Sequence, residues 1–320
     1  MPDQSAAPAR RVLVTGGAGF LGSHLTRLLL SAGHRVTVVD NFSTGTRANL
    51  AHLAHLDALT VLDHDIEVPL DLEVDQIYHL ACPASPVQYQ RDPVRTLKTC
   101  VVGSFNVLDL ARRTGATVLL ASTSEVYGDP AVHPQDEAYW GNVNPMGPRS
   151  CYDEGKRCAE AAFFSYREQH GMPVKVARIF NTYGPGMRAD DGRVVSNFVV
   201  AALHGEPLRV LGDGSQTRSF CYVDDLVDGL VRLMETPEDV TGPINLGNPD
   251  EHTVLELAEM VIALAGAPGA HLEHGPLPVD DPTRRCPNIE RAQWVLGWKP
   301  STTLGEGLAA TVRWFRERAA

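Results

Sequence analysis

A glycine-rich loop near the start of the chain constrains the fold more than any other feature. The loop, Gly16–Gly22, follows a β-branched run, Arg11–Thr15, and its last residues open a segment, Phe20–Ala32, with leucines at helical spacing. Glycines at 16, 19 and 22 allow a tight turn and the close approach of a pyrophosphate to a helix N-terminus. Asp40 ends the next strand, where a carboxylate accepts hydrogen bonds from a ribose 2′-hydroxyl and repels a 2′-phosphate. The loop therefore predicts a dinucleotide-binding fold that prefers NAD to NADP.

Short apolar runs and helical segments alternate through the first half of the chain. Parallel βαβ units produce this alternation, so the sequence predicts a doubly wound (Rossmann) parallel sheet of the α/β class. We expect an NAD-binding domain over residues 1–180 and about 220–250, and a smaller C-terminal α/β lobe over 181–219 and 251–320. Expected strands are 11–15, 36–39, 59–62, 76–80, 118–122, 174–179, 208–211, 218–222 and 244–246; expected helices are 20–32, 93–114, 152–170, 194–204, 224–234, 254–265 and 304–318.

Charge and composition exclude several classes of function. The net charge of −11 argues against a general nucleic-acid binder, which needs a basic face. No apolar run approaches the roughly 18 residues of a membrane span, and Met1–Arg11 has no signal-peptide core. The six cysteines form no C-x-x-C pair, which favours reduced thiols and a cytoplasmic enzyme. The pairs His52–His55 and His271–His274 lack a third ligand, so no metal site is expected.

Tyr152 and Lys156 form a Y-x-x-x-K pair, which on a helix places both side chains on one face. A nearby ammonium favours the phenolate and lowers the pKa of the tyrosine. Such a tyrosine can remove a hydroxyl proton while a hydride leaves the same carbon. Thr123 and Glu125 follow the fifth strand, at the sheet edge where ligands bind in open α/β folds. We expect Thr123 to bond the substrate oxygen and Glu125 to act as a base or to hold a water molecule.

These residues resemble the extended short-chain dehydrogenase/reductase family, and within it the enzymes that decarboxylate UDP-glucuronate. The resemblance extends from about Arg11 to Trp314 and rests on several stretches together. They are His79–Pro86 (HLACPASP), Leu120–Pro130 (LLASTSEVYGDP), Cys151–Lys156 (CYDEGK), Ala177–Pro185 (ARIFNTYGP), Asp191–Phe198 (DGRVVSNF), Gly214–Phe220 (GSQTRSF), Asn245–His252 (NLGNPDEH) and Asp280–Arg285 (DDPTRR).

The resemblance implies a closed redox cycle on a nucleotide-sugar. Bound NAD oxidises the 4-hydroxyl of the glucuronate ring, the 4-ketone accepts electrons as carbon dioxide leaves, and the hydride returns to give UDP-xylose. By the resemblance, Tyr152 is the base and later the acid at the 4-oxygen. Lys156 tunes the pKa of Tyr152 and binds the nicotinamide ribose, and Thr123 forms a hydrogen bond with the 4-oxygen. It assigns decarboxylation and protonation of the fifth carbon to Glu125, with Ser124 beside it, and to Arg285 rather than Arg284.

The resemblance also implies two sets of contacts. The resemblance assigns nucleotide-sugar binding to the smaller lobe. Expected cofactor contacts are Gly16, Gly19, Phe20, Leu21, Gly22, Asp40, Asn41, Phe42, Thr44, Gly45, Asp65, Ile66, Leu80, Ala81, Pro83, Thr99, Ser122, Tyr152, Lys156, Thr182 and Arg193. Expected substrate contacts are Ser85, Lys98, Asn181, Arg188, Val195, Ser196, Asn197, Arg218 and Arg285.

Rival activities remain open at this point. Related dehydratases carry Asp where Ser124 stands, and a serine does not readily supply the proton for a leaving hydroxyl. Related 4-epimerases commonly lack a glutamate at the position of Glu125. A decarboxylase that releases the UDP-4-keto-pentose would share most of these residues, whereas an NAD-binding sensor would typically lose Tyr152 or Lys156. Cys100 departs from the asparagine usual in the family. The resemblance implies that the helices 93–114 and 152–170 form the four-helix interface of a homodimer.

Overall fold

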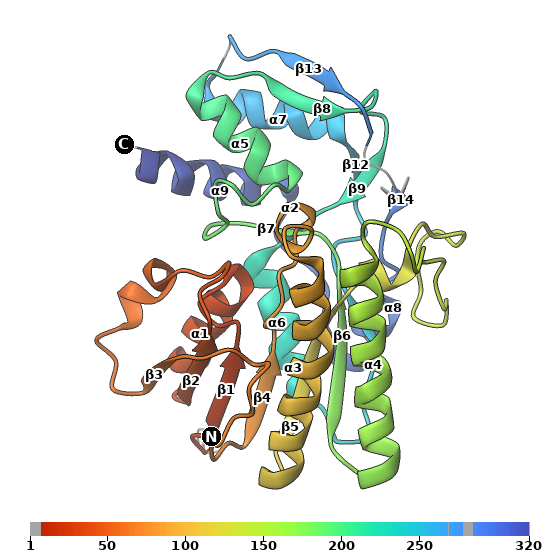
Figure 1. Ribbon diagram of the computed structural model, residues 1–320. Helices are drawn as coiled ribbons and strands as arrows, with labels where there is room; N and C mark the ends of the chain where they lie inside the picture. Colours follow the sequence, from red (N-terminus) through yellow and green to blue (C-terminus); the bar gives the residue numbers. More distant parts are fainter. Residues whose placement is uncertain (1–7, 268, 278–283, 320) are drawn as a thin grey trace, which may run out of the picture.

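Seven parallel strands form the sheet at the base of the molecule, within the residues that this computed structural model describes, 8–267, 269–277 and 284–319 (Figure 1). The sheet order is β11-β6-β5-β4-β1-β2-β3. This is the doubly wound arrangement that the alternating pattern predicts. The bounds are β1 Arg11–Thr15, β2 Arg35–Asp40, β3 Leu59–Asp63, β4 Gln76–His79, β5 Thr117–Thr123, β6 Val174–Ile179 and β11 Ile244–Leu246.

Helices cover both faces of this sheet and create two apolar cores. On one face α3 (Pro93–Thr114) and α4 (Ser150–His170) lie side by side in front of β4, β5 and β6 (Figure 1). On the other face α1 (Phe20–Ser31), α6 (Val223–Met234) and α8 (Glu290–Leu296) pack with β1, β2 and β11. Burial on both faces explains why the strands read as continuous apolar runs.

Helix α3 shows how local sequence fixes an element. The side chain of Asp92 accepts a hydrogen bond from the Arg95 amide at 3.0 Å, and Pro93 takes the first helical position. Gly115 ends the helix in a left-handed conformation, with φ of 71°. The predicted bounds, 93–114, are therefore confirmed at both ends.

A smaller capping lobe lies above the carboxyl ends of the strands (Figure 1). Helices α5 (Val194–His204), α7 (Val254–Ala265) and α9 (Leu304–Ala319) enclose its core, beside a parallel pair, β8 (Leu208–Leu211) and β13 (Leu272–Gly275). Short elements complete the connections: η1 Arg47–Leu53, α2 Pro86–Tyr89, η2 Ser124–Tyr127, β7 Thr182–Tyr183, β9 Thr217–Ser219, β10 Cys221–Tyr222, β12 Glu251–Thr253 and β14 Arg284–Arg285.

Two segments differ from the prediction. The single strand expected at 218–222 is divided, because β9 pairs with β12 and β14 while β10 pairs with β7. The break falls at Phe220, whose side chain is buried in the core of the capping lobe. Residues 289–298, expected in the smaller lobe, pack instead on the sheet, where Trp298 is buried and donates to the Asp225 carbonyl at 2.9 Å. The remaining boundaries of the two domains stay a prediction.

Two parts of the sequence prediction lie outside the described residues. They are Met1–Ala7 and the first four residues, 280–283, of the DDPTRR stretch. Within the described ranges no helix combines the length and the apolar character needed to cross a bilayer.

Lys175 on β6 fastens the sheet to the loop that follows α6. Its buried ammonium donates to the carbonyls of Thr236, Pro237 and Val240 at 3.1, 2.5 and 2.7 Å, and to the Thr236 hydroxyl at 2.9 Å. Burial lowers the pKa of Lys175, yet four acceptors compensate for the lost hydration. The contact ties β6 to the segment that leads into β11, the edge strand beside it.

Replacing Lys175 by methionine is expected to lower the free energy of unfolding by about 3 kcal/mol, because the four oxygens lose their donor. Urea unfolding monitored by circular dichroism measures the change. Lys299→Met is the matched control, since Lys299 is exposed. Equal stability of the two variants would contradict the role given to Lys175.

Candidate active site

A cavity of about 720 Å³ opens at the carboxyl ends of the strands, between the sheet and the capping lobe. Its floor comes from the loops after β1, β2, β4 and β5, and its roof from α5, β9 and β14. The volume is in the range of sites that bury a cofactor or a substrate. The position is the one where parallel α/β sheets bind ligands.

The glycine loop at this cavity leaves no room for side chains. A Cβ atom on Gly22 would lie 2.2 Å from the Gly16 carbonyl oxygen, and one on Gly16, where φ is 72°, would lie 2.9 Å from Ala81. Asp40 accepts hydrogen bonds from the amides of Ala18 and Phe42 at 2.9 and 2.8 Å. The N-terminus of α1, the bare glycines and the buried Asp40 together fit the pyrophosphate and ribose of NAD.

Most of the predicted site residues line this one cavity. On the cofactor side they are Gly16, Gly19, Phe20, Leu21, Gly22, Asp40, Asn41, Thr44, Ile66, Leu80, Ala81, Pro83, Thr99, Ser122, Thr182 and Arg193. Those predicted for the substrate or for catalysis are Ser85, Thr123, Ser124, Glu125, Tyr152, Lys156, Asn181, Arg188, Val195, Asn197, Arg218 and Arg285.

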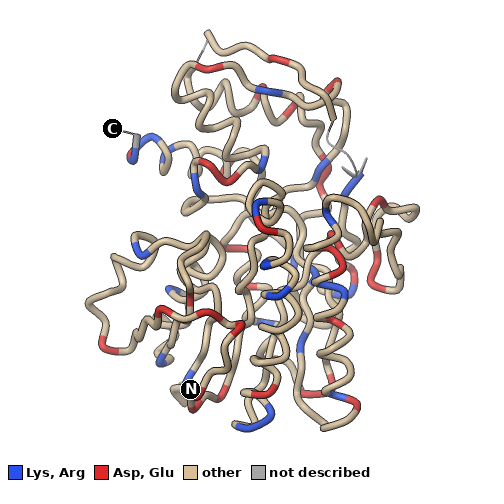
Figure 2. Tube along the Cα trace, viewed as in Figure 1, with Lys and Arg blue, Asp and Glu red and all other residues tan. Residues whose placement is uncertain are grey.

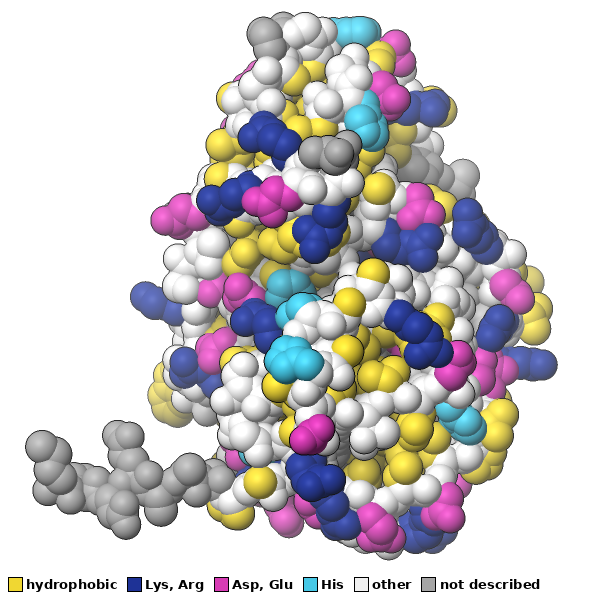
Figure 3. Space-filling view, turned by 90° about the vertical axis from the view of Figure 1, so that its left-hand side faces the viewer, with side chains coloured by type: hydrophobic (Ala, Val, Ile, Leu, Met, Phe, Trp, Pro, Cys, Tyr) yellow, Lys and Arg dark blue, Asp and Glu magenta, His cyan; other side chains and the backbone are white. Residues whose placement is uncertain are grey.

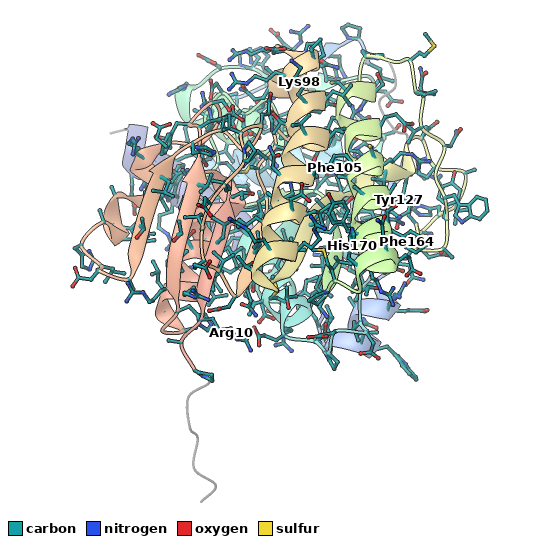
Figure 4. The ribbon with its side chains drawn as sticks, turned by 60° about the horizontal axis from the view of Figure 1, so that its bottom comes forward. Arg10, Lys98, Phe105, Tyr127, Phe164 and His170 are labelled. Carbon is teal, nitrogen blue, oxygen red and sulfur yellow. The ribbon has the colours of Figure 1, made fainter. Side chains whose placement is uncertain are left out.

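Five predicted contacts do not line the cavity. Asp65 accepts hydrogen bonds from the Asn41 amide at 2.9 Å and from Arg95 at 2.8 Å, so it positions Asn41 instead. Lys98 is exposed on α3, near one end of the helix in Figure 4. The other three residues lie behind the cavity wall. The Phe42 amide donates to Asp40, and Gly45 lies against the Asp40 carboxylate. The Ser196 hydroxyl donates to the Arg193 carbonyl.

Tyr152 and Lys156 both reach the cavity from α4. The Tyr152 ring is buried and stacks on Tyr89, with ring centroids 5.0 Å apart and planes 2° apart. Lys156 Nζ donates to the Ala121 carbonyl at 2.9 Å and lies 5.9 Å from the centre of the Tyr152 ring. Burial raises the pKa of Tyr152, and a hydrogen bond with Thr123 opposes the rise. The direction is therefore opposite to the expected lowering of this pKa, because desolvation outweighs the hydrogen bond with Thr123.

Glu125 is clamped between two arginines from distant parts of the chain. Arg149, just before α4, bonds one carboxylate oxygen at 2.6 Å, and Arg285 on β14 bonds the other. Burial alone would raise the pKa of Glu125, but Arg285 and Arg149 outweigh it and lower this pKa to about 2. Arg284 is exposed, as the preference for Arg285 over Arg284 anticipates.

Two residues of this cluster, Arg149 and Asp153, are not predicted as site residues from the sequence. Asp153 is buried one residue after Tyr152, and its Oδ1 has no hydrogen-bond partner. Burial, and then the charge of Glu125, raise the pKa of Asp153 to about 8. The CYDEGK stretch contains Asp153 but gives no sign of its burial, and Arg149 belongs to none of the motifs.

These charges leave the cluster one positive charge in excess at neutral pH. Two arginines face the single carboxylate of Glu125, while Asp153 keeps its proton. Acidic and basic residues otherwise alternate over both parts of the molecule, so this excess is set locally (Figure 2). A buried excess of positive charge suits a ligand that carries a carboxylate.

Three further arginines occupy different parts of the wall. Arg188 donates to the Thr44 carbonyl at 3.3 Å and pairs with Asp190, which places it at the cofactor loop and not beside Glu125. The Arg193 guanidinium lies 5.7 Å from the centre of the Phe20 ring, also at that loop. Arg218 is the register partner of Arg285 across β9 and β14. Of the three, Arg218 is therefore the one placed beside the Glu125 clamp.

A second hollow of about 590 Å³ lies between α1, η1, α5 and α9. Histidine side chains gather near the middle of the face shown in Figure 3, and His24, His52 and His204 line this hollow. Across the described residues no group of three or more His, Cys, Asp or Glu side chains is arranged to hold a metal ion.

Comparisons with known proteins agree with this geometry. The model of the NAD dependent epimerase/dehydratase family matches residues 12–247. UDP-glucuronic acid decarboxylase 1 of Danio rerio is 56% identical over 306 residues, which are 96% of this chain and 72% of that protein. UDP-glucuronic acid decarboxylase 6 of Arabidopsis thaliana is 56% identical over 309 residues, 96% of this chain and 89% of that protein.

Solved structures extend the comparison to related activities. The UDP-glucose 4-epimerase of Thermotoga maritima, with UDP-glucose, is 29% identical with a TM-score of 0.88, covering 97% of this chain and all of that one (100%). The UDP-glucuronic acid 4-epimerase of Bacillus cereus, in complex with UDP-glucuronic acid and NAD, is 26% identical with a TM-score of 0.86. That comparison covers 96% of this chain and 99% of the other.

The raised pKa of Asp153 predicts a pH-dependent stability. Between about pH 4 and pH 8 the folded state holds a proton that the unfolded state has lost, so stability falls as pH rises. Asp153→Asn is expected to remove this fall, which amounts to about 1.4 kcal/mol per pH unit inside the window. Urea unfolding at pH 5, 7 and 9 measures it, with Glu154→Gln as the control. Parallel stability curves for wild type and Asp153→Asn would refute the assignment.

Proposed function

Because the chain belongs to the NAD dependent epimerase/dehydratase family, we propose that it decarboxylates UDP-glucuronate to UDP-xylose, with NAD regenerated in each cycle. The observation that carries the proposal is the Glu125 clamp beside Tyr152, where Arg149 and Arg285 leave a buried positive charge. A neutral hexose needs no such charge, whereas a glucuronate carboxylate does. The relatives at 56% identity are named for this activity.

The reaction begins at the 4-hydroxyl of the sugar. Tyr152 takes its proton while Thr123 holds the oxygen, both from the same edge of the sheet. When bound, NAD accepts the hydride from C4 and later returns it, and its oxidised ring adds a positive charge that favours phenolate. Lys156, fixed to the Ala121 carbonyl, holds the nicotinamide ribose and stabilises the Tyr152 phenolate. The new ketone is β to the carboxylate.

Loss of carbon dioxide then sends an electron pair toward the 4-oxygen. The neutral Tyr152 and the hydroxyl of Thr123 stabilise that oxygen by hydrogen bonding. Arg285 orients the carboxylate before it leaves. Because its pKa is about 2, Glu125 acts as a carboxylate and not as an acid, and with Ser124 it holds the water that protonates C5. The hydroxide left by that water takes a proton from solvent. Return of the hydride to C4 and of the proton from Tyr152 completes UDP-xylose.

The proposal assigns the two halves of the cavity to the two ligands. The glycine loop would hold the pyrophosphate of NAD and Asp40 its adenosine ribose, with Arg193, which lies over Phe20, beside them. The nucleotide-sugar lies under the capping lobe, against Asn181, Val195, Asn197 and Arg218. Arg188 moves to the cofactor side in this assignment because it contacts Thr44.

A homodimer in the cytoplasm is part of the same proposal. Helices α3 and α4 lie side by side and expose apolar side chains, with Phe105 and Phe164 at their surface (Figure 4). Pairing of these helices with those of a second copy would bury them in a four-helix contact. All six cysteines are free thiols, which suits a reducing compartment. The exposed apolar residues of these helices are Val94, Leu97, Val102, Phe105 and Phe164.

Proton NMR of the purified protein with UDP-glucuronate and NAD tests the function. UDP-xylose without net NADH is the expected product. Accumulation of the 4-keto pentose with one NADH per turnover would replace the proposal with the release-type decarboxylase. UDP-galacturonate or a dehydrated sugar would replace it with an epimerase or a dehydratase.

Arg285→Ala is expected to slow decarboxylation by about 100-fold while UDP affinity changes little, because the substrate carboxylate loses its partner. Glu125 keeps Arg149, so the fold is expected to survive. Steady-state rates and UDP titration calorimetry separate turnover from binding. Arg284→Ala is the matched control, and a loss confined to UDP affinity would contradict the role of Arg285.

Phe164→Asp is expected to convert the dimer to a monomer, since a charge would enter the apolar helix contact. Light scattering after size exclusion should give twice the 34.7 kDa chain mass for wild type and a single chain mass for the variant. Trp294→Asp, at an even more exposed aromatic on α8, is the control. An unchanged mass for Phe164→Asp would place the interface elsewhere.

A further inference from the structure

Two thiols lie in contact at the wall of the active-site cavity. The sulfurs of Cys82 and Cys100 are 3.2 Å apart. Cys82 follows β4 on the segment that lines the cavity, and Cys100 is buried on α3. Gly155 of α4 presses on Cys100 from behind, since a Cβ atom there would lie 2.8 Å from Cys100 Cβ. The mechanism above uses neither thiol.

We propose that Cys82 and Cys100 form an oxidation site, where a peroxide entering the cavity converts the two thiols into a disulfide that lowers catalytic activity. The sulfurs need to approach from 3.2 Å to the bonded distance of about 2.05 Å. Cys100 is held by both long helices, so the movement falls on the segment that carries Cys82. The reagent class is a small two-electron oxidant such as hydrogen peroxide.

The chemistry balances with one peroxide. Hydrogen peroxide oxidises the Cys82 thiol to a sulfenic acid and releases one water. The Cys100 sulfur then attacks the Cys82 sulfur, the S–O bond breaks, and the leaving hydroxide takes the Cys100 proton as a second water. Burial raises the pKa of Cys82, so it is its place on the cavity wall that exposes this thiol to peroxide. The hydrogen bond from Cys82, and then the charge of Lys156, lower the pKa of Cys100, which prepares it as the attacking sulfur.

The other cysteines are placed less favourably for this reaction. Cys151 packs in the same apolar cluster, but its thiol is directed to the Tyr89 carbonyl at 3.8 Å. Cys221 and Cys286 bond backbone carbonyls at 3.6 and 3.3 Å. Cys158 is exposed on α4. Peroxide can also reach the exposed Cys158, but the thiols of Cys82 and Cys100 are the pair that lies in contact and can be joined as a disulfide.

A disulfide here would disturb the reaction centre. Tyr152 and Tyr89 pack in one cluster with Cys100, and Cys82 packs against it. Ala81 and Pro83 flank Cys82 and line the cavity on the cofactor side. A displacement of the order of 1 Å in this segment is expected to lower turnover by about 10- to 100-fold.

Peroxide titration of the purified protein tests the proposal. Denatured thiol counting should fall from the six free cysteines by two, and the intact mass by two hydrogens. Peptide mapping should find Cys82 joined to Cys100. Activity should fall in step with the disulfide and return with dithiothreitol. Thiol count and mass do not depend on the proposed function, so a failed assay for UDP-xylose leaves this test intact.

Two variants make the result decisive. Cys100→Ala, whose side chain is outside the cavity wall, should keep its activity and resist both the two-thiol loss and the inactivation. Cys158→Ser should behave as wild type. A disulfide that joins any other pair, or peroxide inactivation of Cys100→Ala at the wild-type rate, would overturn the proposal.

Discussion

The buried carboxylate of Glu125 holds together three parts of the chain that are far apart in sequence. It lies in η2 after β5, Arg149 comes from the start of α4, and Arg285 comes from β14 near the C-terminal end. A buried charge is tolerated only when it is paired, and of the two arginines that pair with Glu125 it is Arg285 on β14 that links the sheet to the capping side of the cavity. The Glu125–Arg285 contact therefore both holds the capping lobe in place and determines the charge that faces the substrate.

Local signals determine much of the fold. Asp92, Pro93 and Gly115 mark both ends of α3, and the glycine loop between β1 and α1 determines the class of sheet. The divided strand at 217–222 could not be read in this way, because its two halves pair with strands that lie elsewhere in the sequence. Likewise Trp294 and Trp298 look alike in the sequence, yet one is exposed and the other buried.

The candidate site shows the same difference between what local sequence determines and what tertiary packing determines. Tyr152, Lys156 and Glu125, which motifs with fixed spacing identify, line the same cavity. Burial and partner choice are tertiary properties, and they decide what the motifs cannot: that Arg149 pairs with Glu125 and that Asp153 keeps its proton. The predicted substrate role of Lys98 had no tertiary support, because that side chain lies on the outer surface of α3.

A closed hydride cycle is the central claim, and isotope labelling tests it most directly. UDP-glucuronate with deuterium at C4 would be converted in ordinary water, and the position of the label in the product would be read by NMR and mass spectrometry. The account predicts that the deuterium stays on C4 of UDP-xylose, because the hydride removed is the one returned. Deuterium found in free reduced cofactor, with an unlabelled 4-keto pentose, would contradict it.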